Sequence, residues 1–444
     1  MESVAIILAA GLGTRMKSSL PKAAHKLANT PMLSHLLRAA ETVFDRIIVV
    51  IGPDTEALTP LAAGHQIVVQ RDRLGTAHAA LQAAEKFGDG TVAILYADNP
   101  LVSAGTMREL AARLKTGDAG LVLLGTTPPD PGRYGRLVTN GDYVTRIVEY
   151  ADASEAERAI SFCNAGGLMA GALDMHCWLK AVQPNNKKGE YYLTDIVEIA
   201  REEGKHVAAI EAPFTECMGV NSRAELAAAE AVMQNRLREA AMTEGVAFLA
   251  PETVFLSADT KLAPDVTIGP FVVFGPGVSI AAGAEIKAFS HLEGCRVHEG
   301  AIIGPYARLR PGADIGAEAH IGNFVEIKEA KIGKGAKANH LSYIGDAEVG
   351  AKSNIGAGTI TCNYDGFSKH RTEIGEGAFV GTNSSLVAPV KIGRGAYIGS
   401  GSVITRDVPD DALAVERTQQ TYREGGAARY RELKGRAKPK KESH

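Results

Sequence analysis

The chain has few of the residues and segments that mark secreted, membrane or nucleic-acid-binding proteins. It holds five cysteines in 444 residues, and no two of them form a C-x-x-C pair, which argues against a disulfide framework or a zinc site and suits a reducing cytoplasm. No apolar run approaches the ~18 residues of a membrane span, and the first apolar run, residues 4–10, lacks the preceding basic stretch of a signal peptide. A formal net charge of −3 gives no reason to expect nucleic acid as a partner. We therefore expect a cytoplasmic protein without a membrane span.

The length and composition predict a globular protein of two or three domains. At 444 residues the chain exceeds one ordinary domain, and its 45% hydrophobic content is enough for packed cores. The one basic run, residues 429–441, lies at the end of the chain. We expect it to be a solvated, disordered tail.

Aliphatic residues recur at every sixth position over the last two-fifths of the chain. The period holds over residues 256–292, 303–327 and 374–404, and glycine often follows the aliphatic residue. A period of six is neither the 3.6 of a helix nor the two of a strand, and it is typical of a parallel β-helix. We expect the glycines to serve the turns at the corners of the coils. An insertion, NYDGFSKH, interrupts the repeat after Cys362 and is expected to loop out on the binding face.

The first 220 residues alternate between strand-like and helix-like segments. The predicted strands are residues 4–9, 46–51, 66–70, 91–96 and 120–125, and the predicted helices include residues 32–43, 77–86 and 103–114. This alternation predicts a parallel α/β sheet with ligands at the carboxyl ends of its strands. An alanine-rich helix over residues 222–242 looks like a connector to the repeats.

A glycine-rich motif follows the first predicted strand. It reads Leu8-Ala9-Ala10-Gly11-Leu12-Gly13-Thr14-Arg15-Met16, with Lys22 six residues later. The backbone N–H groups of such a turn can approach phosphate oxygens, while Arg15 and Lys22 supply positive charge. The motif is not a P-loop, and it is not a dinucleotide fingerprint either, because Met16 stands where the third glycine would be.

The motif resembles the signature of sugar-nucleotide pyrophosphorylases, and matching segments follow in order along the chain. They are Gln70, Leu74-Gly75-Thr76-Ala77, Leu95-Tyr96-Ala97-Asp98, Tyr134-Gly135-Arg136, Glu149, Asn164, Gly189-Glu190-Tyr191-Tyr192 and Gly219-Val220-Asn221. With the hexapeptide half attached, the whole chain resembles the bacterial family of bifunctional N-acetylglucosamine-1-phosphate uridyltransferases and glucosamine-1-phosphate acetyltransferases. The resemblance implies a Rossmann-like nucleotidyltransferase domain at 1–221, a helical linker at 222–246, a left-handed β-helix acetyltransferase domain at 247–428 and a basic tail at 429–444.

For the first domain, the resemblance implies uridylyl transfer from UTP to N-acetylglucosamine-1-phosphate with Mg²⁺ and release of pyrophosphate. Asp98 and Asn221 would bind the ion, because Mg²⁺ takes one or two protein oxygens beside phosphates and water, although Asp98 could instead cap a helix. Arg15 and Lys22 would be catalytic by neutralising the triphosphate. The family usually has glycine at the position of Ala97, and it often has threonine at the position of Ala165. The predicted nucleotide and product ligands are Leu8, Ala9, Ala10, Gly11, Gly13, Lys22, Gln70, Gly75, Thr76, Tyr96, Gly135, Glu149, Asn164 and Asn221.

For the β-helix, the resemblance implies acetylation of glucosamine-1-phosphate by acetyl-CoA in a homotrimer, with the sites between subunits. His340 is the predicted base, because the attacking amine becomes cationic and an imidazole titrates near neutral pH. Thr382 stands where the family usually has serine, and it keeps the hydroxyl group. The predicted sugar-phosphate ligands are Arg310, Lys328, Tyr343, Asn354 and Lys369, and the predicted acetyl-CoA ligands are Asn363, Tyr364, Thr382, Ser400 and Arg417. The product, UDP-N-acetylglucosamine, would feed peptidoglycan and lipopolysaccharide synthesis.

Three other interpretations stay open. The β-helix could be a structural or allosteric module attached to a nucleotidyltransferase, or a trimeric scaffold without catalysis. Cys362 could carry an acyl group, although its register places it near the core, where small apolar cysteines are common. The presence of His340, Asn363 and Lys369 together favours an acetyltransferase.

Overall fold

The computed structural model describes residues 2–53, 55–186 and 189–436, which form two compact units. The first unit comprises residues 1–243 and 255–259, and the second comprises residues 244–254 and 260–444. None of the helices in the described part of the chain has the length and apolar character to cross a membrane.

The first unit is built on a nine-stranded sheet of order β5-β4-β1-β6-β10-β7-β11-β9-β8. Strands β5, β4, β1 and β6 are parallel neighbours, and β10 runs antiparallel between β6 and β7. The carboxyl ends of the parallel strands therefore meet at one edge, as the sequence predicts. The strands are β1 (Ser3–Ala9), β4 (Arg46–Ile51), β5 (Gln66–Val69), β6 (Thr91–Tyr96), β7 (Leu121–Thr126), β8 (Arg136–Asn140), β9 (Tyr143–Val148), β10 (Cys163–Gly171) and β11 (Val207–Glu211).

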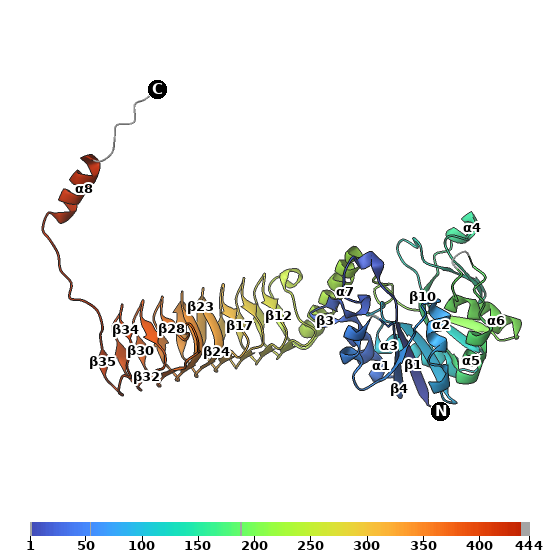
Figure 1. Ribbon diagram of the computed structural model, residues 1–444, viewed down its shortest axis with the longest axis horizontal. Helices are drawn as coiled ribbons and strands as arrows, with labels where there is room; N and C mark the ends of the chain where they lie inside the picture. Colours follow the sequence, from blue (N-terminus) through green and yellow to red (C-terminus); the bar gives the residue numbers. More distant parts are fainter. Residues whose placement is uncertain (1, 54, 187–188, 437–444) are drawn as a thin grey trace, which may run out of the picture. The chain divides into compact units, whose positions relative to one another are not determined.

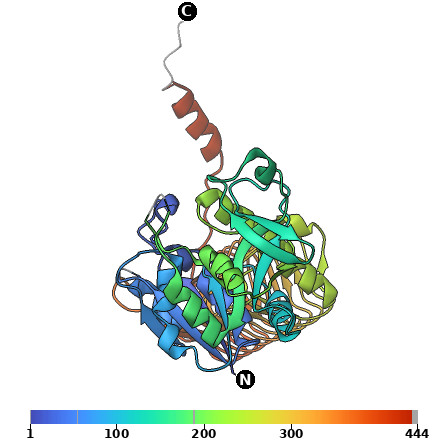
Figure 2. The same cartoon turned by 90° about the vertical axis from the view of Figure 1, so that its right-hand side faces the viewer.

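Helices cover both faces of this sheet, as Figure 2 shows. Alternate residues of β1 enter opposite cores, because successive side chains of a strand point to opposite faces: Ile6 packs with helices α2, α5 and α6, and Ile7 packs with α1 and α3. The helices are α1 (Met32–Glu41), α2 (Thr76–Leu81), α3 (Ala104–Lys115), α4 (Glu155–Arg158), α5 (Ala172–Ala181), α6 (Ile196–Glu202) and α7 (Arg223–Thr243).

The predicted connector helix is α7, and it contributes to the core of the first unit. Its residues Ala229 and Met233 are buried with Met32 and with Leu27 of a two-residue strand, β2 (Lys26–Leu27), which pairs with β3 (Thr30–Pro31). The Gln234 side chain also donates to the Leu256 carbonyl at 2.7 Å and accepts from the Leu256 N–H at 2.8 Å. These contacts explain why residues 255–259 group with the first unit.

The second unit is a parallel β-helix whose short strands pair coil on coil, as Figure 1 shows, consistent with the left-handed hexapeptide form. The strands are β12 (Ala247–Phe248), β13 (Lys261–Leu262), β14 (Thr267–Ile268), β15 (Val273–Phe274), β16 (Ser279–Ile280), β17 (Glu285–Ile286), β18 (His291–Leu292), β19 (Arg296–Val297), β20 (Ile302–Ile303), β21 (Arg308–Leu309), β22 (Asp314–Ile315), β23 (His320–Asn323), β24 (Glu326–Ile332), β25 (Lys337–His340), β26 (Tyr343–Val349), β27 (Asn354–Ile355), β28 (Ile360–Cys362), β29 (Thr372–Ile374), β30 (Phe379–Val380), β31 (Ser385–Val387), β32 (Val390–Ile392), β33 (Tyr397–Ile398), β34 (Val403–Ile404) and β35 (Leu413–Ala414).

The six-residue aliphatic period forms the core of this β-helix, but the glycines act differently from the expectation. Ile268, Ile286 and Ile303 stack in register and are fully buried. Most glycines that follow such residues do not have a positive φ. A Cβ on Gly316 would lie 2.6 Å from the Ile332 carbonyl oxygen of the next coil. Glycine is therefore needed because adjacent coils approach closely.

The corners of the coils carry an exposed row of aromatic rings. Phe271, Phe289, Tyr306 and Phe324 each have a positive φ between 56° and 60°. Their rings stack in sequence with centroid distances of 5.0, 4.8 and 5.3 Å, and 46–56% of each residue is exposed. We call these four residues the aromatic row.

The expectation of a disordered tail is wrong for part of that segment. Residues Gly426–Arg436 form helix α8, in keeping with the high helix propensity of Ala, Arg, Leu, Glu and Lys. Residues 437–444 of the predicted tail lie outside the described residues.

Candidate functional site

The glycine-rich motif forms a tight loop beside Lys22. Gly13 has a φ of 63°, and a Cβ on it would lie 2.6 Å from Cβ of Lys22, so only glycine fits. Lys22 begins a short 3-10 helix, η2 (Lys22–Ala24). The loop therefore holds the base of the Lys22 side chain at the carboxyl end of β1.

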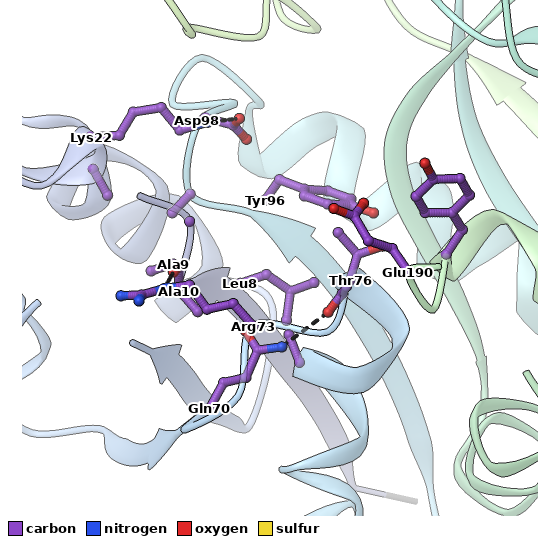
Figure 3. Close-up of a pocket in the computed structure, with 16 residues that line it drawn as sticks. Leu8, Ala9, Ala10, Lys22, Gln70, Arg73, Thr76, Tyr96, Asp98 and Glu190 are labelled. Carbon is purple, nitrogen blue, oxygen red and sulfur yellow. Dashed lines mark hydrogen bonds and ion pairs between the residues drawn. The ribbon is translucent and has the colours of Figure 1, made fainter. Parts of the chain in front are cut away.

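A cavity of about 320 Å³ opens at this edge of the sheet, and Figure 3 shows the side chains around it. Its wall combines the end of β1, the turn before α2 and the end of β6. The lining residues are Leu8, Ala9, Ala10, Gly11, Lys22, Ala23, Gln70, Arg73, Gly75, Thr76, Ala79, Tyr96, Ala97, Asp98, Glu190 and Tyr192.

Lys22 lies between two oxygen atoms that come from distant parts of the chain. Its Nζ donates to Oδ2 of Asp98 and, at 3.0 Å, to Oδ1 of Asn221 (Figure 3 shows the first contact). A carboxylate oxygen and an amide oxygen thus both face the ammonium group of Lys22. Such hard oxygen donors suit Mg²⁺, so these residues fit the predicted metal site. Asp98 does not cap a helix, because Ser103 is the N-cap of α3 and accepts from the Thr106 N–H at 3.1 Å.

The segment before α2 is fixed by a loop from the other half of the unit. Tyr191 donates its N–H to the Leu74 carbonyl at 2.7 Å and accepts from the Ala77 N–H at 3.0 Å. A Cβ on Gly75, whose φ is 126°, would lie 2.4 Å from the Tyr191 carbonyl oxygen. Burial raises the pKa of Tyr96, an effect that a hydrogen bond with Thr76 only partly offsets. The hydroxyl of Tyr96 therefore stays neutral in the wall of the cavity.

A second lobe of about 870 Å³ adjoins the first and shares Thr76, Tyr96, Asp98 and Tyr192 with it. It contains Glu149, Asn164 and Asn221 among its lining residues. The Asn164 N–H donates to the Gly135 carbonyl at 2.8 Å, and a Cβ on Gly135 would lie 3.4 Å from Oε1 of Glu149. The predicted product ligands Gly135, Glu149 and Asn164 are therefore neighbours.

The carboxyl group of Asp195 lies near this lobe. Burial, followed by the charges of Glu198 and Glu149, raises the pKa of Asp195 to about 6.

The first unit places three predicted residues apart from the cavities and adds others. Arg15 is exposed on the loop, and Gly13, Arg15 and Gly135 line neither cavity. Arg73 does line the first cavity, and its Nε donates to the Ala10 carbonyl at 2.9 Å. Its spacing of three residues from Gln70 was the only signal in the sequence. Tyr134, Glu190 and Tyr192 lie in segments that match the family, but they carried no predicted role.

Cationic side chains gather on the 14-stranded sheet of the β-helix. Contact with the ammonium group of Lys369, together with burial and the charge of Lys369, lowers the pKa of Lys328. A hydrogen bond of 2.7 Å to Glu326 raises the pKa of Arg310, whose charge also acts on Lys328. Two adjacent ammonium groups repel each other, and a bound phosphate would relieve that repulsion.

Polar residues complete this cluster. The Asn363 side chain donates to Asp346 and, at 3.4 Å, to the Tyr343 hydroxyl. The negative charge of Asp346 favours the protonated form of Lys369. The predicted ligands Arg310, Lys328, Tyr343 and Lys369 are thus brought together.

His340 has one ring nitrogen fixed by a neighbour on the previous coil. Nδ1 lies 2.6 Å from Oδ1 of Asn323, which pairs with His340 in the ladder of β23 and β25. An amide oxygen only accepts, so Nδ1 carries the hydrogen and Nε2 keeps the lone pair. No role was predicted for Asn323 from the sequence. The contact leaves His340 with the tautomer of a general base.

Asn354 does not join the cationic cluster within one chain. It belongs to β27 of the ten-stranded sheet, where it pairs with Lys337 and Phe379. Of the other predicted sugar-phosphate ligands, Lys328 and Tyr343 belong to strands of the 14-stranded sheet. Arg310 follows a strand of that sheet, and Lys369 lies in the inserted loop.

Three of the predicted acetyl-CoA residues, Thr382, Ser400 and Arg417, form a second group along the coils. The backbone carbonyl of Thr382 accepts from the Gly401 N–H at 2.8 Å, and the backbone carbonyl of Ser400 accepts from Arg417 at 2.7 Å. Tyr364 is exposed on the inserted loop, which a bridge between Tyr364 and Lys369 closes.

The register of Cys362 differs from the expectation. Thr361 is 2% exposed and faces the core, whereas Cys362 is only half-buried. Thr361, and not Cys362, therefore occupies the core-facing position of this strand.

Comparison with known proteins assigns both halves of the chain. The family model for the MobA-like NTP transferase domain matches residues 5–161, and the model for the bacterial transferase hexapeptide (six repeats) matches residues 294–329 and 371–406. The bifunctional protein GlmU of Acidiphilium cryptum is 61% identical over 436 residues, which are 98% of this chain and 100% of that protein. The bifunctional protein GlmU of Gluconacetobacter diazotrophicus is 61% identical over 96% of this chain and 93% of that protein, and that of Rhodospirillum rubrum is 58% identical over 97% of each. Identity at this level over nearly the whole length, in both halves, means that the chain belongs to the family of bifunctional GlmU proteins.

Proposed function

We propose that this enzyme makes UDP-N-acetylglucosamine in two successive reactions. The β-helix acetylates glucosamine-1-phosphate with acetyl-CoA, and the first unit couples the product to UTP with release of pyrophosphate. The observation that carries this proposal is that each unit has its own group of cations beside polar acceptors, around Lys22 in one and around Lys328 in the other.

In the first unit, the reaction must bring several phosphate charges together. The sugar-phosphate oxygen attacks the α-phosphorus of UTP, and pyrophosphate leaves on the opposite side. Lys22 and Arg73 line the cavity beside the glycine-rich loop and would hold and neutralise the triphosphate. Glu149 and Asn164 in the second lobe would orient the sugar. A Mg²⁺ ion bound by Asp98 and Asn221 would supply further positive charge to the phosphates.

In the β-helix, the amine of glucosamine-1-phosphate attacks the thioester carbon of acetyl-CoA. A C–N bond forms, the C–S bond breaks, and the nitrogen gives its proton to Nε2 of His340 while coenzyme A leaves as the thiol after protonation. The Nδ1–H contact with Asn323 supports this role because, in the neutral imidazole, it leaves the lone pair on Nε2. Arg310, Lys328 and Lys369 would bind the phosphate of the sugar.

Two features support a homotrimer with acetyl-transfer sites between subunits. Asn354 lies on a different sheet from the cationic cluster, so a second copy could bring it to that cluster. The aromatic row is half-exposed and ends at Phe324, which directly follows Asn323, the partner of His340. Burial of such rings against a second copy would stabilise the assembly.

Replacing Tyr306 with glutamate should therefore dissociate the assembly. We expect a smaller particle in analytical ultracentrifugation and at least about a tenfold loss of acetyl transfer, because the charge would be buried at the interface. Uridylyl transfer should stay near the wild-type rate. Leu173→Glu, which changes a 76%-exposed leucine of the first unit, is the matched control. A Tyr306→Glu variant with unchanged mass would contradict this interface.

Incubation with glucosamine-1-phosphate, acetyl-CoA, UTP and Mg²⁺, with each omitted in turn, tests the function as a whole. We expect free thiol without UTP, no product of either kind without acetyl-CoA, and UDP-N-acetylglucosamine only with all four. Pyrophosphate release from UTP and glucosamine-1-phosphate at the full rate without acetyl-CoA would contradict the proposed sequence.

A further inference from the structure

The amide group of Gln70 is held in one orientation beside the first cavity. Gln70 is 3% exposed, and its backbone N–H donates to the Ile51 carbonyl at 2.9 Å. Its side-chain Nε2 lies 3.0 Å from the Gly75 carbonyl oxygen and 3.1 Å from Nδ1 of His78. A carbonyl oxygen only accepts, so the Gly75 contact favours the orientation of the amide in which the NH₂ group faces it.

The second N–H of this amide can be satisfied only if His78 presents a lone pair at Nδ1. Nε2 of His78 then carries the ring hydrogen, although Nε2 of Gln82 lies 3.1 Å from it and would donate as well. Gln70 therefore requires the lone pair on Nδ1 of His78, whereas Gln82 requires it on Nε2. Gln82 is exposed, and it also donates to the His78 carbonyl at 3.1 Å, whereas Gln70 is buried. An unmet hydrogen bond costs more free energy in the buried position, so the ring adopts the tautomer that Gln70 requires, with its lone pair on Nδ1.

With both hydrogens of its amide in use, Gln70 can offer a ligand only its oxygen. Gln70 lines the cavity, and we infer that Oε1 is the acceptor it offers there. A pyrimidine with a hydrogen at N3, such as uracil, can donate to it. Cytosine has a lone pair at N3, which the oxygen repels. Cytosine could use its 4-amino group only by shifting one ring position relative to the phosphates that Lys22 and the glycine-rich loop would hold.

We propose that His78 is a positioning residue that sets base specificity: its Nδ1 lone pair locks the Gln70 amide so that the pocket accepts a hydrogen bond from N3–H of the base. This inference rests on the proposed function, because it takes the base of UTP to lie beside Gln70. The ring of Tyr191 is centred 6.2 Å from that of His78.

The test compares kcat/KM for UTP and for CTP in the full-length enzyme with N-acetylglucosamine-1-phosphate as the second substrate. His78→Ala and His78→Phe both remove the acceptor, and the second keeps a ring of similar size. We expect the UTP-to-CTP ratio to fall about threefold to tenfold in both, as for the loss of one hydrogen bond. The fall should come mainly from a higher KM for UTP, with kcat little changed. His78→Asn, whose side-chain oxygen can take the place of Nδ1, should restore most of the ratio.

Gln82→Ala serves as the matched control, because it removes the partner of the other ring nitrogen and should leave the ratio as in the wild type. An unchanged ratio in both His78→Ala and His78→Phe, or an equal fall in His78→Asn and His78→Phe, would overturn the role of His78. Failure of the wild type to use UTP would instead count against the proposed function.

Discussion

Replacement of Asp98 with alanine should lower uridylyl transfer by about 10²–10⁴-fold and leave acetyl transfer at its wild-type rate. Asp98 supplies the carboxylate of the candidate Mg²⁺ site, and its Oδ2 also accepts from Lys22. The charge neutralisation that such a site provides is worth several kcal/mol in the transition state, and about 1.4 kcal/mol corresponds to each tenfold in rate. The measurement is pyrophosphate release from UTP and N-acetylglucosamine-1-phosphate over a range of Mg²⁺ concentrations.

Two controls separate this effect from damage to the fold. Asp89→Ala removes an exposed carboxylate from the same unit and should leave both reactions unchanged. Thermal unfolding of Asp98→Ala should show that the first unit still melts cooperatively. Wild-type turnover with the wild-type Mg²⁺ dependence in Asp98→Ala would refute the metal assignment.

Replacement of His340 with alanine should lower acetyl transfer by about 10²–10⁴-fold, the usual contribution of a placed general base. The expectation follows from the contact with Asn323, which leaves Nε2 free to take the proton of the amine. Release of coenzyme A from acetyl-CoA and glucosamine-1-phosphate gives the rate directly. Uridylyl transfer should not change, because the residues proposed for it lie in the other unit.

A second histidine of the β-helix gives the matched comparison. His291 is exposed on β18, and His291→Ala should acetylate at the wild-type rate. Both variants should keep the mass of the wild-type assembly in solution. If His340→Ala released coenzyme A at the wild-type rate, the β-helix would be a scaffold or module without this chemistry.

The repeat half of the fold could be predicted because its contacts follow the sequence period. Each aliphatic residue meets its counterpart one coil away, so one pattern defines core, register and strand order. The period did not predict why the glycines are needed, because the close approach between coils depends on backbone distances that a sequence period does not contain. It also did not predict the position of Asn354, which depends on the sheet to which each short strand belongs.

The site in the first unit was predictable as a set of motifs but not as a geometry. Lys22 meets residues 76 and 199 positions away in the chain, and no local pattern predicts such contacts. Arg73 lies between Gln70 and the matching segment at 74–77 and was not predicted, because its contact with Ala10 depends on how the strand ends pack. The amide orientation of Gln70 likewise follows from Gly75 and His78, which only the fold brings into hydrogen-bonding distance.

The central claim is that two independent catalytic sites share one chain and pass a released intermediate between them. Asp98→Ala alone should stop at N-acetylglucosamine-1-phosphate, and His340→Ala alone should leave glucosamine-1-phosphate unchanged. The decisive measurement is the yield of UDP-N-acetylglucosamine from glucosamine-1-phosphate, acetyl-CoA, UTP and Mg²⁺ when the two purified variants are mixed. We predict that the mixture makes it at a rate close to half that of the same total amount of wild-type enzyme, whereas a mixture no more active than either variant alone would contradict the account.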